Sequence, residues 1–242
     1  MPAMPPLHRY ERLDALRGLA MLWMAAFHFS FDLNFYKLLP PQNFYNDPFW
    51  TLQRTAIVSL FLLCAGASQT LAHEAGQGAR RFWRRWAQIA ACALLVSAGS
   101  WFMFPRSWIS FGVLHGMAVM LILARALSPL GPRWLAPLGV GAVLLPRFVQ
   151  SPLFDNRWLN WTGLVTHKPV TEDYVPVLPW LGVMLIGLAL GQWLLAHRRE
   201  VMAGPLPRGL APLAVLGRWP LSFYMVHQPV LIGLTVAATM LR

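Results

Sequence analysis

Seven apolar runs divide the sequence, and they constrain the fold more than any other feature. They lie at about 13–30, 50–72, 86–104, 109–127, 134–150, 176–196 and 212–241. A helix of about 20 apolar residues crosses the hydrocarbon core of a bilayer, so seven crossings would use ~140 residues. The composition agrees, because 57% of the 242 residues are hydrophobic and 12% are charged, which is about half the charged fraction of a soluble domain. The sequence predicts an all-α, polytopic membrane helix bundle that forms one domain, residues 1–242.

The first, fifth and last runs contain residues that are unusual in a membrane-spanning helix. Helix-breaking or charged residues interrupt the fifth and last runs: Pro137 and Pro146 in the fifth, and Arg218, Pro220 and Pro229 in the last. Membrane helices tolerate proline where neighbours satisfy the freed carbonyls, so we expect kinks or breaks there. The first run contains Asp14 and Arg17 and lacks a following small-residue cleavage site, so we interpret it as a retained helix and not a signal peptide. Counts of six or eight spans stay open.

Basic residues divide unequally between the two sides that alternating spans would create. One side has four acidic residues and 13 basic ones: Arg9, Arg12, Arg17, Arg80, Arg81, Arg84, Arg85, Arg125, Arg133, Arg198, Arg199, Arg208 and Arg218. The other has five acidic residues and seven basic ones: Lys37, Arg54, Arg106, Arg147, Arg157, Lys168 and Arg242. The positive-inside rule therefore places the N-terminus in the cytoplasm and the C-terminus outside. The basic clusters lie between apolar runs, so anionic lipid is the expected partner and nucleic acid is not.

The longest connections, about 31–49 and 151–175, fall on the outer side and are rich in aromatic residues. Loops of this length are often functional, and we expect them to be packed lids over an outward-facing pocket. Cys64 and Cys92 both lie inside apolar runs, so neither a disulfide nor a metal site is expected. No internal repeat is visible, which weakens the interpretation as an inverted-repeat transporter.

Ionisable residues within membrane helices are functional candidates, because burying them is costly. His28 and Asp32 are spaced i, i+4 in the first run and share a helix face. A carboxylate there could hold the imidazole in one tautomer, as in a general-base dyad. The alternative is that Asp32 caps a polar loop and His28 lies at the interface. The spacing alone leaves both open.

A second charged group lies at the cytoplasmic end of the same run. Arg12, Asp14 and Arg17 cluster there, and Asp14 can pair with Arg17 at i, i+3. The structural interpretation is an ion pair within one helix. The functional one is that the arginines bind a phosphate-bearing donor, because a guanidinium matches phosphate oxygens.

Three further segments carry polar groups. His115 lies in the segment 109–115 that opens the fourth run, where a lone histidine is more often a satisfied core residue than a catalyst. Asp173 precedes the sixth run and could orient a sugar hydroxyl or cap a helix. The last run carries Tyr224, His227 and Gln228 in an apolar context. Burying these groups without partners would be expensive, so they should line a cavity or contact one another.

These segments, in order, resemble a known family. The resemblance rests on Arg12-Leu13-Asp14-Ala15-Leu16-Arg17-Gly18 with His28 and Asp32, on Phe111-Gly112-Val113-Leu114-His115, on residues 173–180 and on residues 216–229. Together they resemble bacterial members of the heparan-alpha-glucosaminide N-acetyltransferase catalytic-domain family, over essentially the whole chain. The spacing from arginine to histidine in the first run is also similar to that of membrane O-acyltransferases that modify surface glycans.

The resemblance implies a transmembrane acyltransferase that takes an acetyl group from cytoplasmic acetyl-CoA and transfers it to a sugar amine or hydroxyl outside. It supports His28 as the catalytic residue. For such an enzyme we expect His28, oriented by Asp32, either to act as general base or to carry the acyl group transiently, and we expect Arg12, Arg17 and Arg218 to bind the donor's phosphates. His115, Asp173 and His227 would line the acceptor side or stabilise the oxyanion. The lysosomal enzyme that names the family has asparagine where His28 stands and its catalytic histidine in the following loop. This chain has no histidine between His28 and His73, so the role falls on His28 and heparan specificity is not inherited.

Two other functions fit the same residues. A transporter for a small solute or lipid-linked precursor would use the same polar path, and a structural or assembly subunit would have no use for it. For the acyltransferase we expect acetyl-CoA as donor substrate with no permanently bound cofactor, a carbohydrate acceptor, and a bacterial inner (plasma) membrane location. A homodimer is compatible with the sequence but is not indicated by it.

Overall fold

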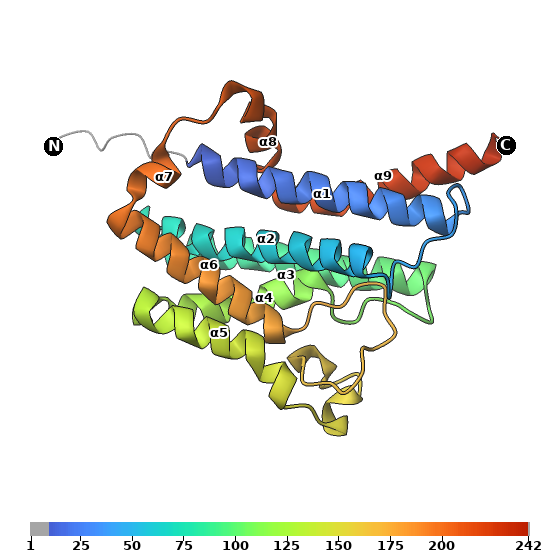
Figure 1. Cartoon of the computed structure of the whole chain (residues 1–242), viewed down its shortest axis with the longest axis horizontal. Coiled ribbons are helices and arrows are strands. Elements are labelled where there is room, and N and C mark those ends of the chain that lie inside the picture. The colour runs from blue at the N-terminus through green and yellow to red at the C-terminus, as the bar shows by residue number, and fades with distance from the viewer. Residues whose placement is uncertain (1–9, 242) are drawn as a thin grey trace. The chain divides into compact units, whose positions relative to one another are not determined.

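The computed structural model describes residues 10–241, and in this range the regular structure is entirely helical (Figure 1). The α-helices are α1 (Glu11–Phe35), α2 (Pro48–Glu74), α3 (Ala79–Met103), α4 (Val113–Leu127), α5 (Pro132–Phe148), α6 (Val177–His197), α7 (Arg199–Ala203), α8 (Ala211–Leu216) and α9 (Pro220–Met240). Short 3-10 turns are η1 (Ser128–Leu130), η2 (Pro152–Asp155), η3 (Asn160–Thr162) and η4 (Arg208–Leu210). The all-α prediction is confirmed for the described residues.

Five of the described helices are long and apolar enough to cross a membrane: α2, α3, α4 continued through η1 to Leu130, α6 and α9. Most of their apolar surface faces outward; in α9 only 11% of the most apolar segment is buried. Such a surface in contact with water would be strongly unfavourable, so it is the lipid-facing surface of an integral membrane protein.

The other two expected spans form helices that do not meet the same criteria. Helix α1 has 25 residues but contains four charged groups in its first two turns and Asp32 near its end. Helix α5 has 17 residues, or roughly 25 Å at 1.5 Å per residue. It continues through Pro137 and Pro146 without a break. A total of seven spans and a cytoplasmic N-terminus remain predictions, and Arg9 and Arg242, which contribute to the charge count, lie outside the described residues.

The last apolar run, 212–241, is not one helix. It folds as α8 and α9, separated at residues 217–219. Pro220 occupies the first turn of α9, where the missing N–H costs nothing because it would have no partner within the helix. The break expected from Arg218 and Pro220 is therefore present, whereas Pro229 lies inside α9.

The chain divides into two compact units, and the division falls within α2 after Phe61. The first unit contains residues up to 61 and from 200 onward, so it joins the two ends of the chain. Within it α1 packs against α8 and α9 (Figure 1). Gly18 lies against the backbone of Leu213, and Gly217 against the Asp14 carbonyl. Neither position has space for a Cβ, so two glycines permit the close approach of α1 and α8.

An aromatic cluster lies beside α1 in the same unit. Phe27, Phe44 and Ile57 are buried together, with Trp50 packed against them. The Phe44 and Trp50 rings stack with centroids 3.9 Å apart. This packing orders the connection from α1 to α2, part of the aromatic-rich 31–49 segment. Its expected role as a lid stays a prediction.

The second unit, residues 62–199, packs its helices through small residues. Gly139 of α5 and Gly182 of α6 lie against each other's backbone, and Gly66 of α2 lies against Met184 of α6. Within a membrane, helix association depends on close van der Waals packing, since lipid removes the hydrophobic driving force between helices. The glycines thus allow α2 and α5 to approach α6 in this unit.

Candidate functional site

Arg12, predicted to bind donor phosphate, links α1 to α7 and to the residue pair that follows it. Its Nε and Nη2 donate to the Pro205 carbonyl at 3.3 and 3.1 Å, and its Nη1 donates to the Val201 carbonyl at 2.9 Å. An arginine has five N–H donors, and all three nitrogens of this guanidinium donate to the two backbone carbonyls. Arg12 has at least a structural role at this end of the first unit.

Arg17 lies five residues further along α1, next to a buried carboxylate. Its Nη1 donates to Asp14 Oδ1 at 2.8 Å and to the Gly217 carbonyl at 2.9 Å. Asp14 is buried, with 7% of its surface exposed. A buried carboxylate requires a charged or hydrogen-bonding partner, and Arg17 provides one. The expected i, i+3 ion pair is present.

Arg218 reaches the same end of the unit from the break between α8 and α9. Its Nη2 lies 3.3 Å from Glu11 Oε1, in a pair that is open to solvent. Exposed pairs of this kind contribute little to stability. The three arginines assigned to the donor site therefore lie around the start of α1, and each contacts a protein group there.

His28 pairs with a histidine from the other end of the sequence. Its Nδ1 lies 2.8 Å from Nε2 of His227 on α9, and the two rings stack with centroids 5.1 Å apart at 16°. His227 is buried, and its Nδ1 lies 2.7 Å from the Tyr224 carbonyl. His28 and Arg17 are eleven positions apart on α1, or about 16 Å at 1.5 Å per residue. The histidine pair is thus well separated from the arginines along one helix.

Asp32 has a different partner from the one expected. Gln228 Nε2 donates to Asp32 Oδ1 and Oδ2 at 2.9 and 3.1 Å, and Asp32 is 4% exposed. Among the described residues no hydrogen bond joins Asp32 to His28. The i, i+4 spacing does place both on the face of α1 that meets α9, but adjacent residues of α9 contact them separately. His227 and Gln228 of the last run thus have partners on α1, and the Tyr224 ring lies next to that of His227.

His115 and Asp173 belong to the second unit, where both contact the start of α4. Asp173 Oδ2 accepts a hydrogen bond from the Val113 amide at 2.7 Å. His115 Nδ1 accepts one from the Gly112 amide at 3.2 Å, and its Nε2 lies 3.1 Å from Ser97 Oγ. Helix N-termini leave amide groups without partners, and these side chains satisfy two of them. Their assignment to the acceptor side stays a prediction.

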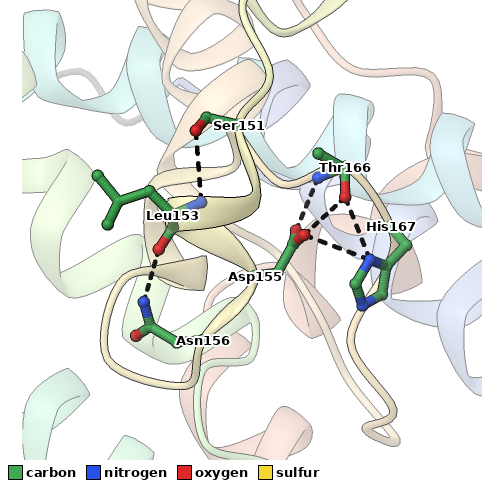
Figure 2. Close-up of polar contacts among 6 residues, drawn as sticks. All are labelled: Ser151, Leu153, Asp155, Asn156, Thr166 and His167. Atoms are coloured by element: carbon green, nitrogen blue, oxygen red, sulfur yellow. Dashed lines mark hydrogen bonds and ion pairs between the residues drawn. The ribbon is translucent and has the colours of Figure 1, made fainter.

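The connection from α5 to α6 is held by a polar cluster that Figure 2 shows. Asp155 accepts hydrogen bonds from the Thr166 amide at 2.7 Å and the Thr166 hydroxyl at 2.6 Å. His167 Nδ1 lies 3.4 Å from Asp155 Oδ2 and 3.2 Å from the Thr166 hydroxyl. Both groups meet the same ring nitrogen, whereas in a catalytic triad the hydroxyl and the carboxylate take opposite nitrogens. The cluster orders the loop and is no nucleophile site.

A pH titration should detect this cluster. Hydrogen bonds from Thr166, together with nearby His167, hold the pKa of Asp155 below its usual range. Because the folded pKa lies below the unfolded one, the loop's stabilisation is complete above the unfolded value of about 3.9 and is lost as pH falls through the folded value. We expect the Asp155 carboxyl ¹³C signal to titrate below 3.9, and in Thr166→Val to titrate closer to 3.9. A midpoint at or above 3.9 in the unmodified protein would contradict this.

Tyr174, which lies between this loop and α6, is held in place by a hydrogen bond. The Tyr174 hydroxyl donates to the Asn160 carbonyl at 2.7 Å. Burial, and then the charge of Asp155, raise the pKa of Tyr174, so this phenol stays neutral and serves as a hydrogen-bond donor.

Within residues 10–241 no three His, Cys, Asp or Glu side chains gather as a metal site would require.

These observations define a class: a helical integral membrane protein with polar side chains paired between α1 and α9. The chain belongs to the family described as heparan-alpha-glucosaminide N-acetyltransferase, catalytic, whose model matches residues 9–229. The family implies an acetyltransferase-type membrane enzyme. No curated protein and no solved structure matches the chain.

Sequence reasoning missed the pairing of His28 with His227 and of Asp32 with Gln228. The signal was present, since polar residues stand in two apolar segments and each would be costly to bury alone. Spacing within one helix cannot show which residues of another helix lie opposite, and so the partners were not predicted.

Proposed function

We propose that this protein transfers an acetyl group from cytoplasmic acetyl-CoA to a sugar amine or hydroxyl on the far side of a bacterial inner membrane. Family membership supports the chemistry. The observation that carries the assignment of residues is the contact between His28 of α1 and His227 of α9. Arginines gather near the start of the same α1 helix. Acetyl-CoA carries its thioester at the end of a long arm, away from its phosphates, and so suits a site with separated anion-binding and proton-transfer groups.

His28 acts as the general base in this proposal. Its Nε2 takes the proton from the acceptor hydroxyl or amine as that oxygen or nitrogen attacks the thioester carbonyl. The tetrahedral intermediate then collapses, the C–S bond breaks, and the proton passes from His28 to the departing thiolate. The products are the acetylated acceptor and free coenzyme A, and His28 returns to its starting state.

The other predicted site residues have supporting roles. Asp32 fixes α1 against α9 through Gln228, and the arginines at the start of α1 bind the donor's phosphates. The assignment of His115 and Asp173 to the acceptor side stays a prediction from the sequence. A homodimer also stays a prediction.

Arg218 offers the sharpest test of the donor site, because its exposed contact with Glu11 contributes little to stability. In Arg218→Gln we expect the KM for acetyl-CoA to rise about tenfold with kcat little changed, as for a group that binds donor and transition state equally. Release of the coenzyme A thiol by protein in nanodiscs, with a panel of amino and neutral sugars, measures both constants.

Arg208→Gln is the matched control, because Arg208 is exposed in the same unit and has no proposed site role. It should leave the KM unchanged. An unchanged KM in Arg218→Gln, with the same melting temperature, would remove Arg218 from the donor site.

A further inference from the structure

The contacts around His227 determine which of its ring nitrogens carries hydrogen. Its Nδ1 lies 2.7 Å from the Tyr224 carbonyl, and a carbonyl oxygen only accepts hydrogen bonds. His227 Nδ1 must therefore be the donor. In a neutral imidazole the other nitrogen, Nε2, is then an acceptor.

The tautomer of His227 in turn determines that of His28. Its Nδ1 lies 2.8 Å from His227 Nε2, so when that nitrogen accepts, His28 Nδ1 must carry hydrogen. The Nε2 of His28 then has a free lone pair. A carbonyl oxygen on α9 thus specifies, through two rings, which edge of His28 can remove a proton.

A doubly protonated His227 would reverse the second hydrogen bond and place hydrogen on His28 Nε2. The surroundings favour the neutral ring, because His227 is buried and stacks against Phe223 with centroids 5.8 Å apart at 5°. The buried carboxylate of this part of the unit, Asp32, takes its hydrogen bonds from Gln228. A buried imidazolium without an acidic partner would be costly.

We propose that His227 is a positioning residue that holds His28 in the Nδ1–H tautomer, with Nε2 directed to the reacting group. This inference rests on the proposed role of His28 as general base. It replaces the acceptor-binding role that the sequence assigned to His227. When His28 Nε2 takes a proton, the hydrogen bond from His28 Nδ1–H to His227 Nε2 stabilises the charged His28 ring. The proton then passes to the departing thiolate, so both histidines return to their starting states.

Nitrogen NMR of ¹⁵N-histidine-labelled protein in nanodiscs tests the tautomer without any substrate. We expect His28 to show a protonated Nδ1 and an unprotonated Nε2, assigned by loss of its signals in His28→Gln. His227→Leu should shift His28 toward the Nε2–H form that prevails in water. His227→Gln, whose side-chain oxygen reaches the place of Nε2, should keep the Nδ1–H form. Phe223→Leu touches the same ring but not the hydrogen bonds, and should not change the tautomer.

Activity supplies the second readout. We expect kcat to fall on the order of 100-fold in His227→Leu and to recover at least tenfold in His227→Gln, at matched melting temperatures. An Nε2–H tautomer of His28 in the unmodified protein would overturn the inference, as would an unchanged tautomer in His227→Leu. If the tautomers behave as expected but the protein does not turn over acetyl-CoA, the positioning contact stands and the proposed function fails.

Discussion

Replacing His28 by glutamine is expected to lower kcat for acetyl transfer by 100-fold or more, with little change in the KM for acetyl-CoA. General-base catalysis contributes about 10²–10⁴-fold, and glutamine fills a similar space but cannot hold the proton. The side chain is only partly buried and its hydrogen bond in the described residues is to His227, so the fold should survive. Coenzyme A release and acetylated product are measured together.

His73→Gln is the matched control for this substitution. His73 is an exposed histidine at the end of α2 with no proposed site role, so its replacement should leave kcat within twofold. Full activity in a folded His28→Gln protein would remove His28 from the mechanism. Equal losses in both variants would show that histidine chemistry at position 28 is not special.

Replacing Gly217 by alanine is expected to lower the free energy of unfolding by about 2–3 kcal/mol, in the upper range for overpacking. A Cβ there would overlap the Asp14 carbonyl oxygen, which is backbone and cannot rotate away. The Gly217 carbonyl also accepts from Arg17, so separation of α1 from α8 would disturb the Asp14–Arg17 pair. Thermal unfolding in detergent, followed by intrinsic tryptophan fluorescence, measures the loss.

Gly209→Ala isolates the steric cause. Gly209 lies in the same unit, and a Cβ there has nothing within 4 Å. Both glycines have ordinary backbone angles, so alanine adds no conformational strain at either site. We expect Gly209→Ala to unfold at the same temperature as the unmodified protein. A similar result for Gly217→Ala would show that α1 and α8 do not approach as closely as described.

Much of the fold could be predicted from the apolar runs, because length and hydrophobicity define a membrane helix with little reference to its neighbours. Six of the seven runs each became one helix, α1 to α6, with ends shifted by up to seven residues. The last run divided, because Pro220 begins a new helix and residues 217–219 connect it to α8. Hydrophobicity alone carries no information about such a break, which was expected from Arg218 and Pro220.

The site was predictable in its members more than in its contacts. Residue types identified His28, Asp32, His227 and Gln228 as costly groups in apolar surroundings. The spacing left a His28–Asp32 contact open, and each side chain has another partner on α9, because i, i+4 spacing defines a shared face and not a partner. Arg12 shows the same limit, since its acceptors are backbone carbonyls of residues 201 and 205, which no side-chain pattern reveals.

Isotope transfer from acetyl-CoA tests the central claim most directly. Purified protein in proteoliposomes receives acetyl-CoA with a ¹³C-labelled acetyl group on one side and a panel of amino and neutral sugars on the other, and mass spectrometry follows both products. We predict a labelled acetyl group on a sugar, one coenzyme A released per transfer, and loss of both in His28→Gln. Absence of labelled sugar and of acetyl-CoA turnover, in folded protein that still exchanges a solute across the bilayer, would contradict the account.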